Sequence, residues 1–224
     1  MGYYIDLRSI SIDNYKEVLK SAYLIPSRMI LKENTDDNLN KLKEHSFENL
    51  EELQKALKNK KKLPELSRQF DIPVRFLEVL RAEINGYLQK PNKIKDFPDI
   101  DDEVAGKLER IGIKDSLKLY GEVLTPQKRN DLSNKSGVSR KNIQKLTRLS
   151  DLSRIRWVNH TFAYVLFEAG FDTAKKVAEA DCIHLYETIK KLNEERRIYN
   201  AHIGLNDMKL CVDFAKNLDF EIDY

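Results

Sequence analysis

The residues best suited to chemistry in this sequence are cations that gather in one stretch. Between positions 126 and 160 the chain has nine lysines and arginines against two acids, a local net charge of +7. The chain as a whole carries only +3. If several of these side chains share a face, they would contact several phosphates of a polyanion, and the affinity would fall steeply with salt. The alternative is a solvated helical surface whose charges keep the protein soluble.

The same stretch ends in a predicted helix start at residues 155–160. The first N–H groups of a helix lack partners within the helix, and they carry the positive end of the helix dipole, so a helix start can bind phosphate. Contacts of this kind position a nucleic-acid backbone without reading its bases. We therefore predict nucleic-acid contacts from the side chains at and before this start: Arg140, Lys141, Lys145, Arg148, Arg154, Arg156, Asn159 and His160.

Trp157, the only tryptophan, lies within this turn. We expect its ring to pack in the core or against a partner, and stacking on a base or sugar is the alternative.

The turn and the helix after it recur along the chain. Residues 97–113 return 58 positions later as residues 155–171, where seven apolar positions stay apolar and the helix-ending glycine stays as Gly112 and Gly170. At an offset of 66, residues 31–84 correspond to residues 97–150. A constant offset across many core-type positions favours an ancient duplication, with a third, partial copy from Ile155.

The repeated unit resembles the helix-hairpin-helix motif, whose turn reads apolar, any residue, glycine, apolar, glycine. The two turns, Phe97–Asp101 and Ile155–Asn159, keep the apolar positions and replace both glycines. The stretch from Asp96 to Leu218 is similar to an uncharacterised family of tandem helix-hairpin-helix domains. The matching pieces are residues 111–113, 132–139, 150–155 and 168–173. The resemblance implies an all-α fold of tandem repeats with a SAM-like helical bundle architecture, and it implies no agreed activity.

Apolar residues at helical spacing independently predict helices throughout, and no long alternating segment predicts a sheet. The Pro-containing linker Lys90–Lys93 predicts two domains. These are an N-terminal helical domain of residues 1–92, with a degenerate repeat, and a C-terminal repeat domain of residues 93–224. The acidic turn at 96–103 carries five carboxylates, which would repel phosphate, so we expect a purely structural turn there.

Composition and motifs argue against catalysis. The chain is 41% apolar and 33% charged, as in folded soluble proteins. Its four histidines and two cysteines show no metal-ligand spacing, and it has no Walker or dinucleotide-binding motif. We expect a protein without enzymatic activity, cofactor or metal.

No secretory signal and no apolar run of the ~20 residues that span a bilayer is visible, so we expect a cytoplasmic protein with reduced cysteines and no membrane contact.

Two functions remain. The first is sequence-independent binding of DNA or another nucleic acid through the turns and the basic stretch at 126–160. The alternative is a protein-interaction or scaffold module made of repurposed repeats. The missing turn glycines, the nearly balanced charge and the acidic turn favour this alternative, because stacked helical repeats form extended surfaces that suit protein partners.

Overall fold

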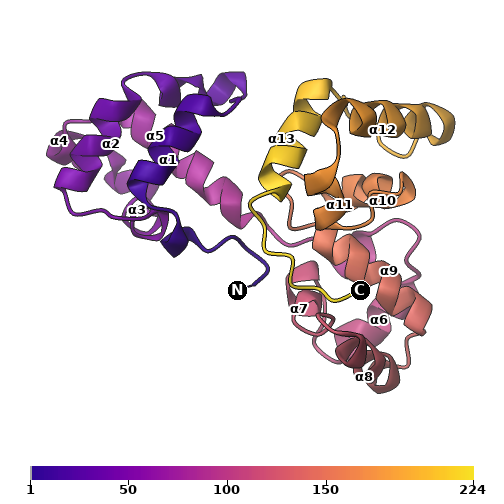
Figure 1. The fold of residues 1–224 in the computed structure, drawn as a ribbon. Coiled ribbons are helices and arrows are strands. Elements are labelled where there is room, and N and C mark those ends of the chain that lie inside the picture. Colours follow the sequence, from indigo (N-terminus) through magenta and orange to yellow (C-terminus); the bar gives the residue numbers. More distant parts are fainter. Residues whose placement is uncertain (1) are drawn as a thin grey trace. The chain divides into compact units, whose positions relative to one another are not determined.

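The computed structural model describes residues 2–224, and within that range the chain is helical and has no strand. The predicted all-α class is therefore confirmed. The chain divides into two compact units (Figure 1). One comprises residues 6–88, and the other comprises residues 89–224 together with the residues up to Ile5. The expected boundary followed residue 92, but residues 89–92 belong to the second unit. They are tied there because Gln89 Nε2 donates to the Ile155 carbonyl at 2.9 Å, and Asn92 Nδ2 donates to Ser153 Oγ at 2.9 Å.

The unit of residues 6–88 contains five α-helices joined by short 3-10 segments. The α-helices are α1 (Ile12–Ser21), α2 (Thr35–Glu44), α3 (Leu50–Ala56), α4 (Leu63–Phe70) and α5 (Val74–Asn85), and the 3-10 segments are η1 (Leu7–Ser9), η2 (Pro26–Lys32), η3 (Lys60–Lys62) and η4 (Gly86–Leu88). Leucines at helical spacing point inward, and Leu42, Leu53 and Leu77 have no exposed surface. These side chains form one apolar core, and removing them from water is the main term that holds the unit together.

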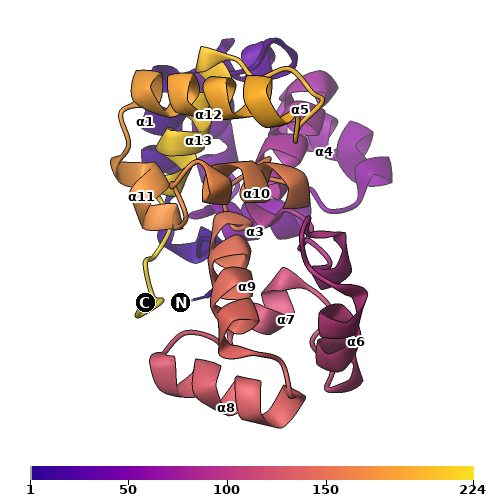
Figure 2. The same ribbon diagram turned by 90° about the vertical axis from the view of Figure 1, so that its right-hand side faces the viewer.

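The unit of residues 89–224 contains the remaining helices. They are η5 (Ile94–Asp96), α6 (Asp102–Arg110), α7 (Ser116–Tyr120), α8 (Pro126–Ser136), α9 (Arg140–Leu152), α10 (His160–Glu168), α11 (Ala174–Glu179), α12 (Cys182–Arg196) and α13 (Leu205–Ala215). The helix α9 packs against α7, α8 and α10 (Figure 2). The helix α13 packs against α11 and α12. The fully buried Ile143, Leu146 and Leu149 make α9 central to this core.

The same order of four helices recurs three times, and left-handed residues flank the corresponding helices in each copy, although Asn34 directly precedes its helix whereas Asp99 and Trp157 lie three residues before theirs. The described residues with positive φ are Asn34, Ser46 and Asp71 in the first copy, Asp99, Gly112 and Gly137 in the second, and Trp157, Gly170 and Arg197 in the third. The first residue of each set precedes α2, α6 or α10, and the second follows that helix. The third residue separates α4 from α5, α8 from α9, and α12 from α13. The third copy is therefore complete in its helices, although the sequence indicated only a partial one.

Hydrogen bonds repeat at the same places. After the first helix of each copy, the N–H of Phe47, Ile113 or Phe171 donates to the carbonyl five residues earlier, at 3.3, 3.0 and 3.0 Å. This bond, together with the left-handed residue before it, is the usual way in which a helix ends. The next helix is capped in each copy by a side-chain oxygen, from Asn49, Asp115 or Thr173. The recurrence thus lies in the backbone as well as in the apolar pattern.

Candidate nucleic-acid interface

The turn at 155–160 connects α9 to α10 and contains two of the predicted contacts in exposed or partly exposed positions. The Asn159 side chain accepts a hydrogen bond from the Phe162 N–H at 2.9 Å, and it therefore caps α10. His160 is the first residue of that helix and is half-buried. Since the cap already occupies the Asn159 side-chain oxygen, this residue first serves the helix start.

Arg154 and Arg156 are buried, so the expectation that they form an exposed basic surface is wrong. Arg154 is 3% exposed. Its guanidinium donates to Asp151 Oδ1 at 2.8 Å and to the backbone carbonyls of Tyr3 and Asp219 at 3.2 and 2.7 Å. Arg156 is 7% exposed, and its guanidinium lies 4.1 Å from the centre of the Trp157 ring. Arg154 can be buried because its donors find these acceptors inside the protein.

Lys145 and Arg148, on α9, are engaged by acids of other segments. The Lys145 ammonium donates to the Asp99 carboxylate, and this bond holds the pKa of Asp99 below its ordinary value of 3.8. Arg148 Nη1 lies 2.5 Å from Asp172 Oδ2. Of the α9 cations predicted to bind, Arg140 and Lys141 are the exposed ones. The net charge of +7 counted along residues 126–160 is smaller in the folded protein. Asp99 and Asp172, which lie outside this stretch of sequence, pair with Lys145 and Arg148.

The acidic segment of residues 219–224 contacts Arg129 and Arg154 of the basic stretch. Arg129 Nη2 donates to the Asp223 carbonyl at 2.6 Å, and the Asp223 N–H donates to the Leu124 carbonyl at 2.9 Å. The Tyr224 hydroxyl donates to Asp151 Oδ2 at 2.9 Å. The last residues of the sequence therefore contact part of the basic stretch, and Arg129 and Arg154 hold the segment through its backbone carbonyls.

Trp157 lies on the surface, so the expected core position is wrong, and packing against a partner stays a prediction. The residue is 48% exposed and its φ is +66°. It occupies the third position of the turn, as Asp99 does in the preceding copy with a φ of +57°. The backbone N–H of Trp157 donates to Gln89 Oε1 at 2.8 Å. A bulky residue is rare in this backbone region, so the position is held by its surroundings.

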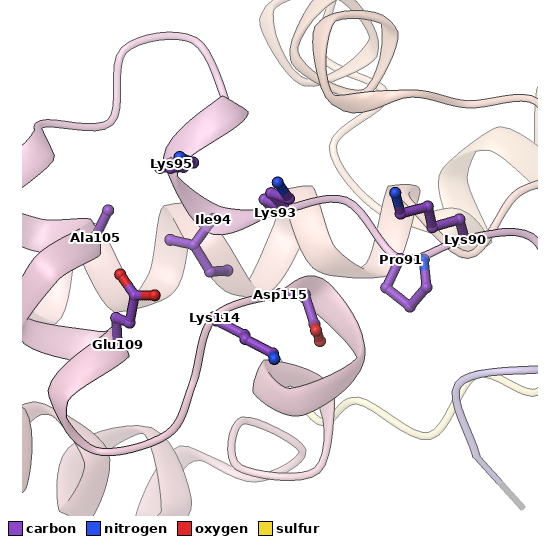
Figure 3. A pocket seen from close by; sticks show the side chains of 9 residues that line it. All are labelled: Lys90, Pro91, Lys93, Ile94, Lys95, Ala105, Glu109, Lys114 and Asp115. Carbon is purple, nitrogen blue, oxygen red and sulfur yellow. The ribbon is translucent and has the colours of Figure 1, made fainter.

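A cluster of cations that the sequence did not single out lies around a hollow of about 430 Å³ (Figure 3). We call it the lysine hollow; its lining includes Lys90, Lys93, Lys95 and Lys114, together with Glu109 and Asp115. All four lysines are exposed, and no ion pair joins any of them to an acid of residues 2–224. Four cations against two acids leave an excess of two positive charges.

Short backbone contacts bring the two parts of the lysine hollow together. The Ile94 N–H donates to the Lys114 carbonyl at 3.0 Å, and the Ser116 N–H donates to the Asn92 carbonyl at 2.8 Å. These bonds hold the segment 90–95 against the loop between α6 and α7. In Figure 3 the amines of Lys90 and Lys93 point to the same side, while Lys114 is directed away from them. The amines are spread along the hollow rather than gathered on one point.

Sequence reasoning missed this cluster because it interpreted Lys90–Lys93 as a linker. Three lysines within six residues, at 90, 93 and 95, were a visible signal. Lys114 carried no such signal, since only the backbone contacts of the fold bring it to the other three.

The remaining polar groups define few other sites. Within residues 2–224, no group of three or more histidines, cysteines, aspartates or glutamates is placed to hold a metal ion. None of the helices in this range combines the length and apolar character needed to cross a bilayer. Cys182 and Cys211 are free thiols, and burial raises the pKa of Cys211 to about 12. A thiol with so high a pKa is a poor nucleophile at neutral pH.

The chain is therefore an all-helical protein with a recurring four-helix order and an exposed cationic hollow. Residues 98–218 match the family described as a domain of unknown function, DUF4332, and the chain belongs to that family. No curated protein and no solved structure gives a significant match to the sequence.

Proposed function

We propose that the unit of residues 89–224 binds the phosphate backbone of nucleic acid without sequence preference and without catalysing a reaction. The observation that carries this proposal is the lysine hollow, whose four exposed lysines have no acidic partner among the described residues. Amines that are spread apart suit a chain of phosphates better than a single small anion. Lysine supplies a point charge that attracts phosphate without fixing its geometry, so such contacts do not read sequence.

The turns support the same proposal. We propose that the recurring units are degenerate helix-hairpin-helix repeats. The motif has glycine at the third position of its turn, and Asp99 and Trp157 have positive φ at that position. The backbone conformation that glycine favours is thus present although the residue is not. The substituted side chains prevent the main chain from coming close to a phosphate, so the exposed cations near the turns take over that contact.

The test is a titration of the full chain with a labelled duplex and a labelled single strand, measured by fluorescence anisotropy. The variant Lys93→Ala/Lys114→Ala removes two amines from the lysine hollow. The matched control, Lys191→Ala/Lys209→Ala, removes two exposed lysines elsewhere in the same unit. We expect the first variant to weaken binding several-fold at low salt and the control to change it little. Equal affinity of wild type, variant and control would reject the lysine hollow as the binding site.

A second candidate function is protein binding. It is favoured by three apolar side chains of the same unit, Trp157, Ile183 and Leu205. Each of them exposes more than two fifths of its surface. Exposed apolar side chains mark a protein contact where they lie together on one surface. A stoichiometric protein partner that co-purifies, with an absorbance ratio at 260 and 280 nm typical of protein alone, would favour this function over nucleic-acid binding.

A further inference from the structure

Trp157 combines exposure with an unusual backbone conformation. It is the only tryptophan of the chain, almost half of it is exposed, and its φ is +66°. The corresponding position in the preceding copy is Asp99, a residue type that tolerates left-handed φ. Because a large aromatic ring gains little from burial here, its presence at a costly position suggests a role outside the fold.

Gln89 holds the backbone of Trp157, and Arg156 contacts its ring. The Trp157 N–H donates to Gln89 Oε1 at 2.8 Å, and Gln89 Nε2 donates back to the Ile155 carbonyl at 2.9 Å. The guanidinium of Arg156 lies 4.1 Å from the ring centre. Arginine over an aromatic ring is a favourable cation–π contact, and it restricts the orientations that the ring can take. A restrained exposed ring loses little conformational entropy when a flat ligand packs on it.

The same hydrogen bonds connect the backbone of the turn to the segment that begins the lysine hollow. Gln89, which holds the Trp157 backbone, directly precedes Lys90 of the hollow. Asn92 Nδ2 donates to the Val158 carbonyl at 3.3 Å, so the segment 89–92 is tied to the turn at both of its ends. The turn that carries the ring is therefore held against the segment that begins the lysine cluster.

We propose that Trp157 stacks on an unpaired base of a single-stranded nucleic acid while the lysine hollow holds the adjacent phosphates. This inference rests on the proposed function and adds the substrate class, single strand in preference to duplex. A cationic surface that follows the backbone, together with an exposed aromatic ring, is the combination that binds single strands without sequence preference. In a duplex the faces of the bases are already stacked on one another, so the ring gains nothing from them.

The only tryptophan makes the test direct, because its emission reports on position 157 alone. The full chain is titrated with an oligothymidine of about 16 nucleotides, the upper end of the site sizes known for single-strand-binding domains, and with a duplex of equal length. We expect the single strand to quench the emission and the duplex to leave it nearly unchanged. The variant Trp157→Gly, whose residue accepts the left-handed φ, should bind the single strand about 10-fold more weakly and the duplex equally well.

The variant Trp157→Phe provides the matched control, since a smaller ring retains part of the stacking. Its single-strand affinity should lie between those of the wild type and Trp157→Gly. Binding of the single strand without quenching, and with equal affinity of all three proteins, would overturn the stacking role and leave the proposed function in place. The absence of salt-dependent binding to both nucleic acids would overturn the proposed function and the inference together. If Trp157→Gly does not fold, as judged by circular dichroism, quenching in the wild type and the affinity of Trp157→Phe decide the result.

Discussion

The turns at 97–101 and 155–159 have the same backbone and opposite surface chemistry. In the first turn Asp99 has a φ of +57°, and its carboxylate binds the Lys145 ammonium of α9. In the second turn Trp157 has a φ of +66° and presents an exposed ring beside the buried Arg156. The recurring conformation is thus a scaffold. The side chain at its third position decides whether the turn is tied to a neighbouring helix, as at Asp99, or exposes a ring to solvent, as at Trp157.

The largest expected effect is the difference in unfolding free energy lost when the ion pair near each turn is broken. Arg154 and Asp151 have side chains only 1% and 5% exposed, whereas the side chains of Lys145 and Asp99 are 15% and 71% exposed. Removing one partner of a buried pair leaves an uncompensated charge, so Arg154→Ala should lower the free energy of unfolding by about 3–5 kcal/mol. Lys145→Ala should cost less than about 1 kcal/mol, because water screens an exposed pair. Urea unfolding of both variants measures the difference, and similar losses would show that burial does not distinguish the two turns.

A smaller effect tests whether the two copies share one backbone. Gly112 and Gly170 both have a φ of +87°, and a Cβ at either position would meet no atom within 4 Å. Alanine at either glycine therefore brings backbone strain without a clash, and each variant should lose about 1–2 kcal/mol of unfolding free energy. Gly106, inside α6 with equally open surroundings, is the control. Gly106→Ala should stabilise by about 0.5–1 kcal/mol. Unequal losses at Gly112 and Gly170 in thermal unfolding would weaken the equivalence of the copies.

The smallest effect is the pH dependence of the first turn. The bond from Lys145 holds the pKa of Asp99 below 3.8, so the ionised carboxylate is favoured in the folded protein. Its contribution is complete well above pH 3.8 and is lost as the pH falls through the lower folded-state value. Asp99→Asn keeps a residue that tolerates positive φ and removes the charge. The stability difference between wild type and variant should be under about 1 kcal/mol at neutral pH and vanish in acid. A difference that grows as the pH falls would contradict this assignment.

The sequence predicted the helical class and the places where the copies correspond, because helix period and helix-ending glycines are local signals. Gly112 and Gly170 indicated left-handed positions directly, and their φ values agree. The chemistry at those positions depends on contacts across the unit. Nothing near Arg154 in the sequence shows that the carbonyls of Tyr3 and Asp219 accept its hydrogen bonds.

The candidate site was predicted less well for the same reason. A count of charges within 126–160 could not include Asp99 or Asp172, which pair with Lys145 and Arg148 from outside that window. At the lysine hollow the sequence instead underestimates how many cations lie together. Lys114 joins Lys90 and Lys93 only through backbone hydrogen bonds between distant segments. Charge along the sequence is therefore a poor guide to charge in space where helices from several copies pack together.

The dependence of nucleic-acid affinity on salt tests the central claim most directly. Each phosphate that a cation neutralises contributes about 0.7 to the slope of log affinity against log salt for a single strand. If the four lysines of the lysine hollow bind phosphates, the full chain should show a slope of about −2 to −3. A slope near zero, or no binding at low salt, would contradict the account.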